Sequence, residues 1–164
     1  MSQKGVCGMG GLLAALDQGR ANVRDLDDPA ALRGHADALL MVRHSRFSGF
    51  GFYAASPNAE RLIGAAMMLD PTVCADGSGH TLIVGVNIAS GTQIARAATR
   101  LRESGNEGVL VGVVLNALIE DWQREQASWT VPEVDVLLVL DGDERSVLGE
   151  LAQRGECGVG LAFH

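Results

Sequence analysis

Aromatic residues are scarce in this chain: four Phe, two Trp and one Tyr make up 4% of its 164 residues. The hydrophobic core must therefore be built mainly from Ala, Val and Leu, and a nucleic-acid surface that stacks bases on aromatic rings is excluded. The chain also has no block of five or more Lys or Arg, and its formal net charge is -7. Binding to a phosphate backbone needs concentrated positive charge, so we expect no nucleic-acid partner.

Long apolar runs and targeting signals are missing as well. No apolar stretch reaches the roughly 18 residues of a membrane-spanning helix, and the opening residues, MSQKGVCGMGG, lack the regions of a signal peptide. We therefore expect a cytoplasmic protein without membrane contact. Cys7, Cys74 and Cys157 form no CxxC pair, which predicts reduced, buried thiols. The His residues show no ligand spacing, so we expect no metal site.

The chain does contain a regular alternation of aliphatic runs and helix-like segments. Thr81–Val86, Val109–Leu115 and Val134–Leu140 are near-continuous runs of β-branched residues and Leu, typical of strands buried on both faces. The alternation predicts an α/β fold: one domain over residues 1–164, a three-layer Rossmann-like sandwich with a mostly parallel sheet of five to seven strands.

The remaining elements are predicted from shorter signals. Asp27-Asp28-Pro29 is typical of a helix start, and His44–Ser56 is expected to be a loop rich in glycine and aromatic residues. The other expected strands or apolar runs are Lys4–Met9, Ala21–Leu26, Ala38–Arg43 and Val159–Phe163. The other expected helices are Leu12–Gln18, Pro57–Leu69, Gln93–Glu103, Glu120–Ala127 and Glu144–Arg154.

A candidate binding loop follows the strand Thr81–Val86. In HTLIVGVNIASGTQIARAATRL the aliphatic run breaks into a polar loop, Asn87–Thr92, and restarts as an amphipathic helix. Ligands of open parallel sheets bind beyond the carboxyl ends of strands. Backbone amides, the hydroxyls of Ser90 and Thr92 and the helix dipole favour an anion there, such as a phosphate. In the alternative, Ser90 or Thr92 only caps the helix and Gly91 makes the turn.

The segment LIVGVNIASGTQIARAATRLRESGNEGVLVGVVL resembles the central motif of type I phosphoribosyltransferases. In that family a strand is followed by two acidic residues that contact ribose hydroxyls, two aliphatic residues, and a Thr/Ser-Gly loop. The loop binds the 5-phosphate of phosphoribosyl pyrophosphate. The resemblance places Ala89, Ser90, Gly91 and Thr92 on the phosphate loop, and Gly85 and Val86 at the acidic positions.

Gly85 and Val86 cannot replace ribose-binding carboxylates. The resemblance therefore implies a degenerate domain that binds a phosphate-bearing small molecule, a nucleotide or a sugar phosphate, with weak or lost catalysis. A residual transferase would need a carboxylate from elsewhere, and Asp141 is the candidate. Upstream, RHSRFSGFGFYAASPNAERLIGA (Arg43–Ala65) is loosely similar to the Arg- and Gly-rich loop of ComF-type members.

Three cationic side chains are candidates for a phosphate clamp. Arg43, His44 and Arg46 end or follow the expected strand Ala38–Arg43, so they would lie at its carboxyl end, facing the same crevice as Ser90. LLMVRH also resembles the phosphate-accepting motif of histidine phosphatases. The second His of that family is absent here, because VGVN stands where VGHN is expected.

The alternative function is that of a non-catalytic subunit or assembly factor acting through protein contacts. In that interpretation the aromatic loop Phe47–Tyr53 is an interface, and a homo-oligomer is possible. The same loop could instead cover a ring-bearing ligand or pack its own Phe side chains.

Two further motifs favour structural roles. Asp141, Asp143 and Glu144 follow the strand Val134–Leu140, where carboxylates can hold Mg²⁺, but DGDE is more typical of a turn and helix start. GVCGMGG around Cys7 lacks both GxGxxG spacing and a P-loop Lys, so nucleotide hydrolysis by a P-loop is not expected.

Overall fold

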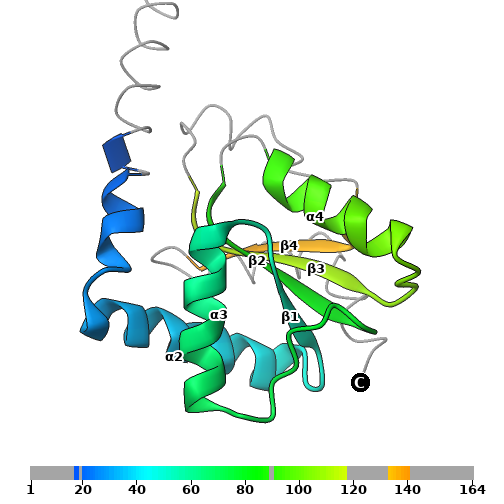
Figure 1. Cartoon of the computed structure of the whole chain (residues 1–164), viewed down its shortest axis with the longest axis horizontal. Coiled ribbons are helices and arrows are strands. Elements are labelled where there is room, and N and C mark those ends of the chain that lie inside the picture. Colours follow the sequence, from blue (N-terminus) through cyan, green and yellow to red (C-terminus); the bar gives the residue numbers. More distant parts are fainter. Residues whose placement is uncertain (1–16, 19, 89–90, 118–132, 141–164) are drawn as a thin grey trace, which may run out of the picture.

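The computed structural model describes residues 17–18, 20–88, 91–117 and 133–140. In this part of the chain four strands form one sheet in the order β1-β2-β3-β4, and all the pairings are parallel (Figure 1). The strands are β1 (Gly51–Ala54), β2 (Thr81–Ile88), β3 (Leu110–Ala117) and β4 (Val136–Val139), and the helices are α2 (Pro29–Arg46), α3 (Pro57–Leu69) and α4 (Thr92–Glu103). Residues 20–25 are also helical. The α/β class and the parallel sheet are confirmed.

Two helices begin as their sequences predict. Asp28 caps α2 by accepting a hydrogen bond from Ala31 N at 3.2 Å, and Pro29 occupies the first turn, where its missing N–H costs nothing. Ser56 caps α3 in the same way, followed again by a proline. The predicted segments Pro57–Leu69 and Gln93–Glu103 are confirmed as α3 and α4, and the three predicted aliphatic strands as β2, β3 and β4.

Two expected strands are wrong, because both are helical. Ala38–Arg43 lies within α2, and residues 21–25 of the expected strand Ala21–Leu26 form helix. The buried residues of α2 include Ala36, Leu39, Leu40 and Arg43, which follow helical spacing, whereas Met41 in the middle of the aliphatic run is 69% exposed. The expected loop His44–Ser56 contains the edge strand β1.

Helices cover both faces of the sheet, with α2 and α3 on one face and α4 on the other (Figure 1). Successive β2 residues point to opposite faces: Leu82 and Val84 pack with α2 and α3, and Ile83 packs with α4. The first cluster also holds Leu39, Phe52, Leu62, Val111 and Val113; the second holds Ile94, Ala97, Leu101, Leu110 and Val114. The aliphatic strands are therefore buried on both sides.

The chain leaves β1 and β2 toward opposite faces of the sheet, because α3 packs in one core cluster and α4 in the other. After α3 it passes along the outer edge of β1, where Phe52 N donates to Cys74 O at 2.8 Å, before it enters β2. After α4 it continues to β3, so the four described strands follow one another in the sheet in chain order. The carboxyl ends of β1 and β2 therefore lie between two loops that diverge to opposite faces.

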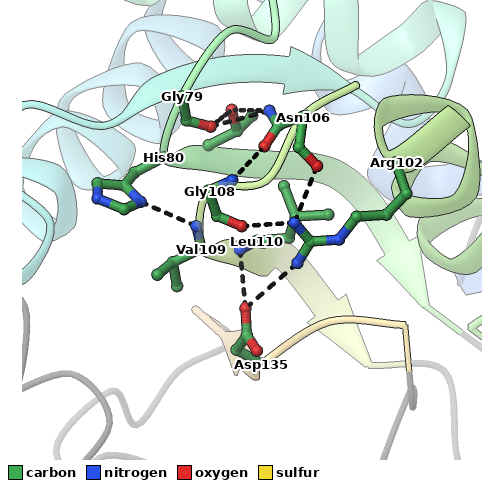
Figure 2. A network of polar contacts seen from close by, with 9 residues as sticks. Gly79, His80, Arg102, Asn106, Gly108, Val109, Leu110 and Asp135 are labelled. Carbon is green, nitrogen blue, oxygen red and sulfur yellow. Dashed lines mark hydrogen bonds and ion pairs between the residues drawn. The ribbon is translucent and has the colours of Figure 1, made fainter. Parts of the chain in front are cut away.

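A polar network fixes the amino ends of the inner strands (Figure 2). Asn106, 8% exposed, donates from Nδ2 to Gly79 O at 2.8 Å and accepts at Oδ1 from Gly108 N at 2.8 Å. Val109 N donates to His80 Nδ1 at 2.8 Å. These bonds tie the turn that precedes β2 to the turn that precedes β3.

Arg102 and Asp135 extend this network to β4. Arg102 Nη1 donates to Gly108 O at 2.6 Å, and Arg102 Nη2 lies 3.8 Å from Asp135 Oδ2. The same carboxylate oxygen accepts from Leu110 N at 2.9 Å. The α4 helix, β3 and β4 are therefore joined at one edge of the sheet (Figure 2).

Several predictions fall outside the described residues. These are the elements expected at Lys4–Met9, Glu120–Ala127, Glu144–Arg154 and Val159–Phe163, all but the end of Leu12–Gln18, and the residues Cys7, Asp141, Asp143, Glu144 and Cys157. Within the described ranges, no helix has both the length and the hydrophobicity needed to cross a membrane.

Candidate functional site

The candidate site lies where β1 and β2 end. Ala54, the last residue of β1, pairs with Val84, and β2 continues for four residues to Ile88. The α3 helix begins just after β1, and α4 begins at Thr92, with Gly91 as its N-cap, after a loop of three residues that follows β2. The N-termini of two helices on opposite faces of the sheet thus follow two neighbouring strand ends, and ligands of open α/β sheets bind beyond the carboxyl ends of strands.

The two helix N-termini differ in whether the chain's own side chains meet their free backbone N–H groups. Ser56 Oγ accepts from Ala59 N at 3.4 Å at the start of α3, and Glu60 adds a carboxylate to its first turn. Gly91 caps α4 with φ 82° and ψ 3°, has no side chain to accept from the helix amides, and is followed by a first turn without acidic residues. An external anion is therefore favoured at α4 rather than at α3.

The position of α4 depends on two glycines in the sheet. A Cβ on Gly85 would lie 3.4 Å from Ile94 Cδ1, and a Cβ on Gly112 would lie 3.2 Å from Ile94 Cγ2. Ile94, in the first turn of α4, thus fills a notch in β2 and β3. This contact holds the first turn of the helix against the sheet.

The same packing surrounds Gly85 and Val86, the two positions that the resemblance to phosphoribosyltransferases aligns with an acidic pair. A Cβ on Gly85 would also lie 3.1 Å from Val114 Cγ1, and Val86 is 3% exposed among the apolar residues under α2 and α3. Neither position has room or solvent for a carboxylate. Both positions therefore serve the packing of the core.

Asparagines end both central strands at the carboxyl edge. Asn87 on β2 pairs in register with Asn116 on β3, and both are half-buried. Paired residues of neighbouring parallel strands lie about 4.8 Å apart. Asn87 was predicted as a site residue, whereas Asn116 was not. A signal for it exists in the sequence, because each strand ends on the same pattern, GVNI and VLNA.

Of the predicted phosphate loop, Gly91 and Thr92 are described, and Ala89 and Ser90 lie outside the described residues. Thr92 and Arg96 are both exposed and lie four residues apart, so they share one face of α4. Side chains of a helix lean toward its N-terminus. The Arg96 side chain therefore leans toward the first turn of the same helix and can bring a positive charge there. Sequence analysis did not identify this residue.

The expected clamp of Arg43, His44 and Arg46 does not join this site. Arg43 Nε donates to Phe50 O at 2.6 Å, and Phe50 directly precedes β1. Gly51 N in turn donates to His80 O, just before β2, so Arg43 lies at the amino edge of the sheet. The eight residues of β2 separate the two edges by about 23 Å. The clamp was predicted at the carboxyl edge because Ala38–Arg43 was predicted to be a strand, whereas this segment is part of α2.

Instead, this cluster joins the ends of α2 and α3. Asp70 Oδ2 lies 3.1 Å from His44 Nε2 and 3.7 Å from Arg43 Nη1. Asp70 Oδ1 accepts from the hydroxyl of Thr72 at 2.6 Å and from its backbone N at 3.0 Å. These two hydrogen bonds, followed by the charges of His44 and Arg43, lower the pKa of Asp70 below its ordinary value of 3.8. The cluster therefore links the C-terminal ends of α2 and α3 and has a structural role.

The aromatic loop packs its own side chains. Phe47, Phe50 and Phe52 are at most 7% exposed, and the Phe47 and Phe50 rings lie 5.2 Å apart. These buried rings form neither an exposed interface nor a cover for a ligand. Cys74, which was expected to be buried, is exposed, because its backbone pairs with the edge strand while its neighbour Val73 enters the core.

Among the described residues, no three His, Cys, Asp or Glu side chains gather as a metal site would require. No protein-family model matches the chain, and no curated protein matches it.

Proposed function

We propose that the loop between β2 and α4 binds a phosphate-bearing small molecule, a nucleotide or a sugar phosphate, in a phosphoribosyltransferase-like domain whose catalysis is weak or lost. The observation that carries the proposal is the left-handed Gly91 at the N-terminus of α4, beyond the carboxyl end of β2. In this proposal the four described strands belong to a larger three-layer Rossmann-like sandwich of five to seven strands.

The charges around α4 support an anionic ligand. The first turn of α4 lacks acidic residues, and a helix N-terminus favours a nearby negative charge by about 0.3–1 kcal/mol. Thr92 supplies a hydroxyl at the first helical position, and Arg96 supplies a guanidinium one turn later. Because Arg forms two parallel hydrogen bonds with phosphate, it adds orientation as well as charge.

The packing around Gly85 supports binding without transfer. Ribose recognition in the resembling family depends on carboxylates, and Gly85 and Val86 are both enclosed by apolar side chains. A phosphate bound at Gly91 would thus have a loop like the phosphate loop of that family, but the ribose attached to it would have no carboxylates to bind. We therefore expect phosphate affinity without turnover of phosphoribosyl pyrophosphate.

Calorimetric titration with ribose 5-phosphate tests the proposal. Gly91→Ala places a Cβ on a residue with φ 82°, and this left-handed backbone then costs about 1–2 kcal/mol, so the turn before α4 is strained or rearranged. Gly49→Ala is a matched control, because Gly49 has φ 83°, no atom within 4 Å of a new Cβ, and a place at the opposite edge of the sheet. We expect Gly91→Ala to lose binding and Gly49→Ala to keep it.

A thermal-stability screen with phosphate, ribose 5-phosphate, phosphoribosyl pyrophosphate and nucleotides identifies the ligand class. A ligand at a hundredfold its dissociation constant adds about 2.7 kcal/mol to the free energy of unfolding. Equal loss of binding in the Gly91 and Gly49 variants, or no shift with any compound, would reject the proposal.

A second candidate is the assembly role, and exposed methionines favour it. Met41 on α2 is 69% exposed and Met68 on α3 is 84% exposed. Met side chains adapt to varied apolar partners. Light scattering of the wild type and of Met68→Lys tests self-association. If both proteins are monomers, self-association through these methionines is rejected.

A further inference from the structure

His80 connects the amino ends of three strands. Its main-chain oxygen accepts from Gly51 N at 3.0 Å at the start of β1, and its ring nitrogen Nδ1 accepts from Val109 N at 2.8 Å, just before β3 (Figure 2). The ring also stacks on the buried Phe50, with 5.2 Å between the ring centroids and 25° between the ring planes. Because His80 directly precedes β2, this one residue holds the starts of β1, β2 and β3 together.

The hydrogen bond from Val109 requires an uncharged imidazole. A ring nitrogen accepts a hydrogen bond only while it carries no proton, so the neutral ring of His80 has its single proton on Nε2. Protonation places N–H groups on both nitrogens, and the new Nδ1–H then opposes the N–H of Val109. Val109 is only 9% exposed, so its amide loses its acceptor at a position with little access to water, and the charged ring has to turn away.

Arg102 of α4 brings a positive charge to this edge of the sheet. Its Nη1 donates to Gly108 O at 2.6 Å, directly before Val109. Asp135 lies 3.8 Å from the Arg102 guanidinium and accepts from Leu110 N at 2.9 Å. The carboxylate of Asp135 is thus bound by the arginine and by the main chain of β3.

Further charged groups come from the turns before β2 and β3 and from α2. Asp76 is held by two hydrogen bonds within its own turn, and Glu107 is exposed. Arg43 of α2 donates to the carbonyl of Phe50, the residue on whose ring His80 stacks. A proton on His80 therefore adds positive charge to an edge that already holds arginines from α2 and α4.

We infer that His80 is a pH-sensitive switch: its neutral ring holds the turn between α4 and β3 to the start of β2, and its protonated ring releases Val109. Imidazole changes charge between about pH 5 and pH 8. The contribution of this hydrogen bond is therefore present at the upper end of that range and is lost toward the lower end. His80 lies at the edge of the sheet opposite Gly91, so the switch does not depend on the proposed function.

His44 should respond to acid in the opposite direction. Its Nε2 lies 3.1 Å from Asp70 Oδ2, and it belongs to the last turn of α2, where a positive charge is favoured. Protonation of His44 thus strengthens the contact between α2 and the end of α3, whereas protonation of His80 weakens the contact between β2 and β3. His44→Asn is therefore a matched control for the loss of one histidine.

Amide hydrogen exchange of the full chain tests the switch, with each rate divided by the intrinsic rate at the same pH. Between about pH 7.5 and about pH 5.5 we expect the protection of Val109 in the wild type to fall roughly two- to tenfold, the factor that one hydrogen bond gives. The protection of Val84, in the centre of β2, should stay constant. His80→Asn places a non-titrating oxygen near the position of Nδ1, so Val109 should stay protected at both pH values. His44→Asn should behave as the wild type does.

Constant protection of Val109 in the wild type, or an equal fall in His80→Asn, would overturn the inference. The wild type also provides a measurement that needs no substitution. A scalar coupling across the hydrogen bond, between the nitrogen of Val109 and Nδ1 of His80, should be present at about pH 7.5 and absent at about pH 5.5. Its absence at the higher pH, or its persistence at the lower pH, would equally overturn the inference.

Discussion

Ile94 packs so closely over Gly85 that a Cβ on the glycine would lie 3.4 Å from Ile94 Cδ1. Restoring the first acidic position of the transferase motif with Gly85→Asp should therefore fail. We expect the free energy of unfolding to fall by about 3–5 kcal/mol, because an unpaired carboxylate enters the core. Gly85→Ala, the control for added volume alone, should cost about 1–3 kcal/mol. Denaturant unfolding measures both, and a stable Asp variant that turns over phosphoribosyl pyrophosphate would contradict the packing argument.

Arg96 and Arg100 provide a charge-matched comparison on α4. Both are exposed, and Arg100 lies one turn farther from the N-terminus of the helix. Arg96→Gln should weaken binding of ribose 5-phosphate about tenfold, since a charged hydrogen bond contributes about 1.5–3 kcal/mol. Arg100→Gln should change the affinity by less than about twofold at physiological salt, where charges are screened over about 8 Å. Equal effects in a calorimetric titration would show that net charge alone matters.

Gly108→Ala should destabilise the protein strongly. A Cβ there would lie 2.5 Å from the Gly79 carbonyl carbon and 2.7 Å from His80 N, and backbone atoms cannot yield as a flexible side chain does. We expect a loss of about 3 kcal/mol or more in the free energy of unfolding. Gly64→Ala on α3 is the control, because no atom lies within 4 Å of its new Cβ. That variant should gain about 0.5–1 kcal/mol from helix propensity, and a comparable loss in both variants would contradict the prediction.

Asp70 should make stability depend on acid. Its pKa is lowered in the folded protein, so its contribution is complete above the ordinary value of 3.8 and is lost as the pH falls through the lower, folded-state pKa. Urea midpoints measured from pH 5 down to pH 2 should fall less steeply in Asp70→Asn than in the wild type. Asp37→Asn, an exposed change on α2, is the control for the loss of one carboxylate. Parallel curves for all three proteins would refute a role for Asp70.

Long, uniform signals were sufficient to predict the centre of the fold. Apart from Thr81 and one glycine in each, the runs Thr81–Val86 in β2 and Val109–Leu115 around β3 consist of Val, Ile and Leu, and α3 begins with Ser-Pro, so their types and positions followed from the sequence. The six-residue run Ala38–Arg43 was not sufficient, because an aliphatic stretch of that length suits a strand or a buried helix. The capped start at Asp28-Pro29, continued without a break, decides for helix.

The candidate site was predictable only where it is local. The loop after β2 was placed correctly at a carboxyl end, because a buried strand followed by Ser-Gly-Thr is a contiguous pattern. Arg43 was assigned to the wrong edge, since the misassigned strand reversed the direction of its element. The contact between Asn22 and Asn87 joins residues 65 apart, and one sequence contains no signal that pairs them.

The hydrogen bond from Phe52 N to Cys74 O has a consequence for the behaviour of the protein at high concentration. An uncovered outer strand is a template on which other molecules can add strands, and such growth leads to fibrils. Here β1 is only four residues long, and its own chain occupies the amide at Phe52. The molecule thus blocks intermolecular sheet growth at this edge with a single backbone carbonyl.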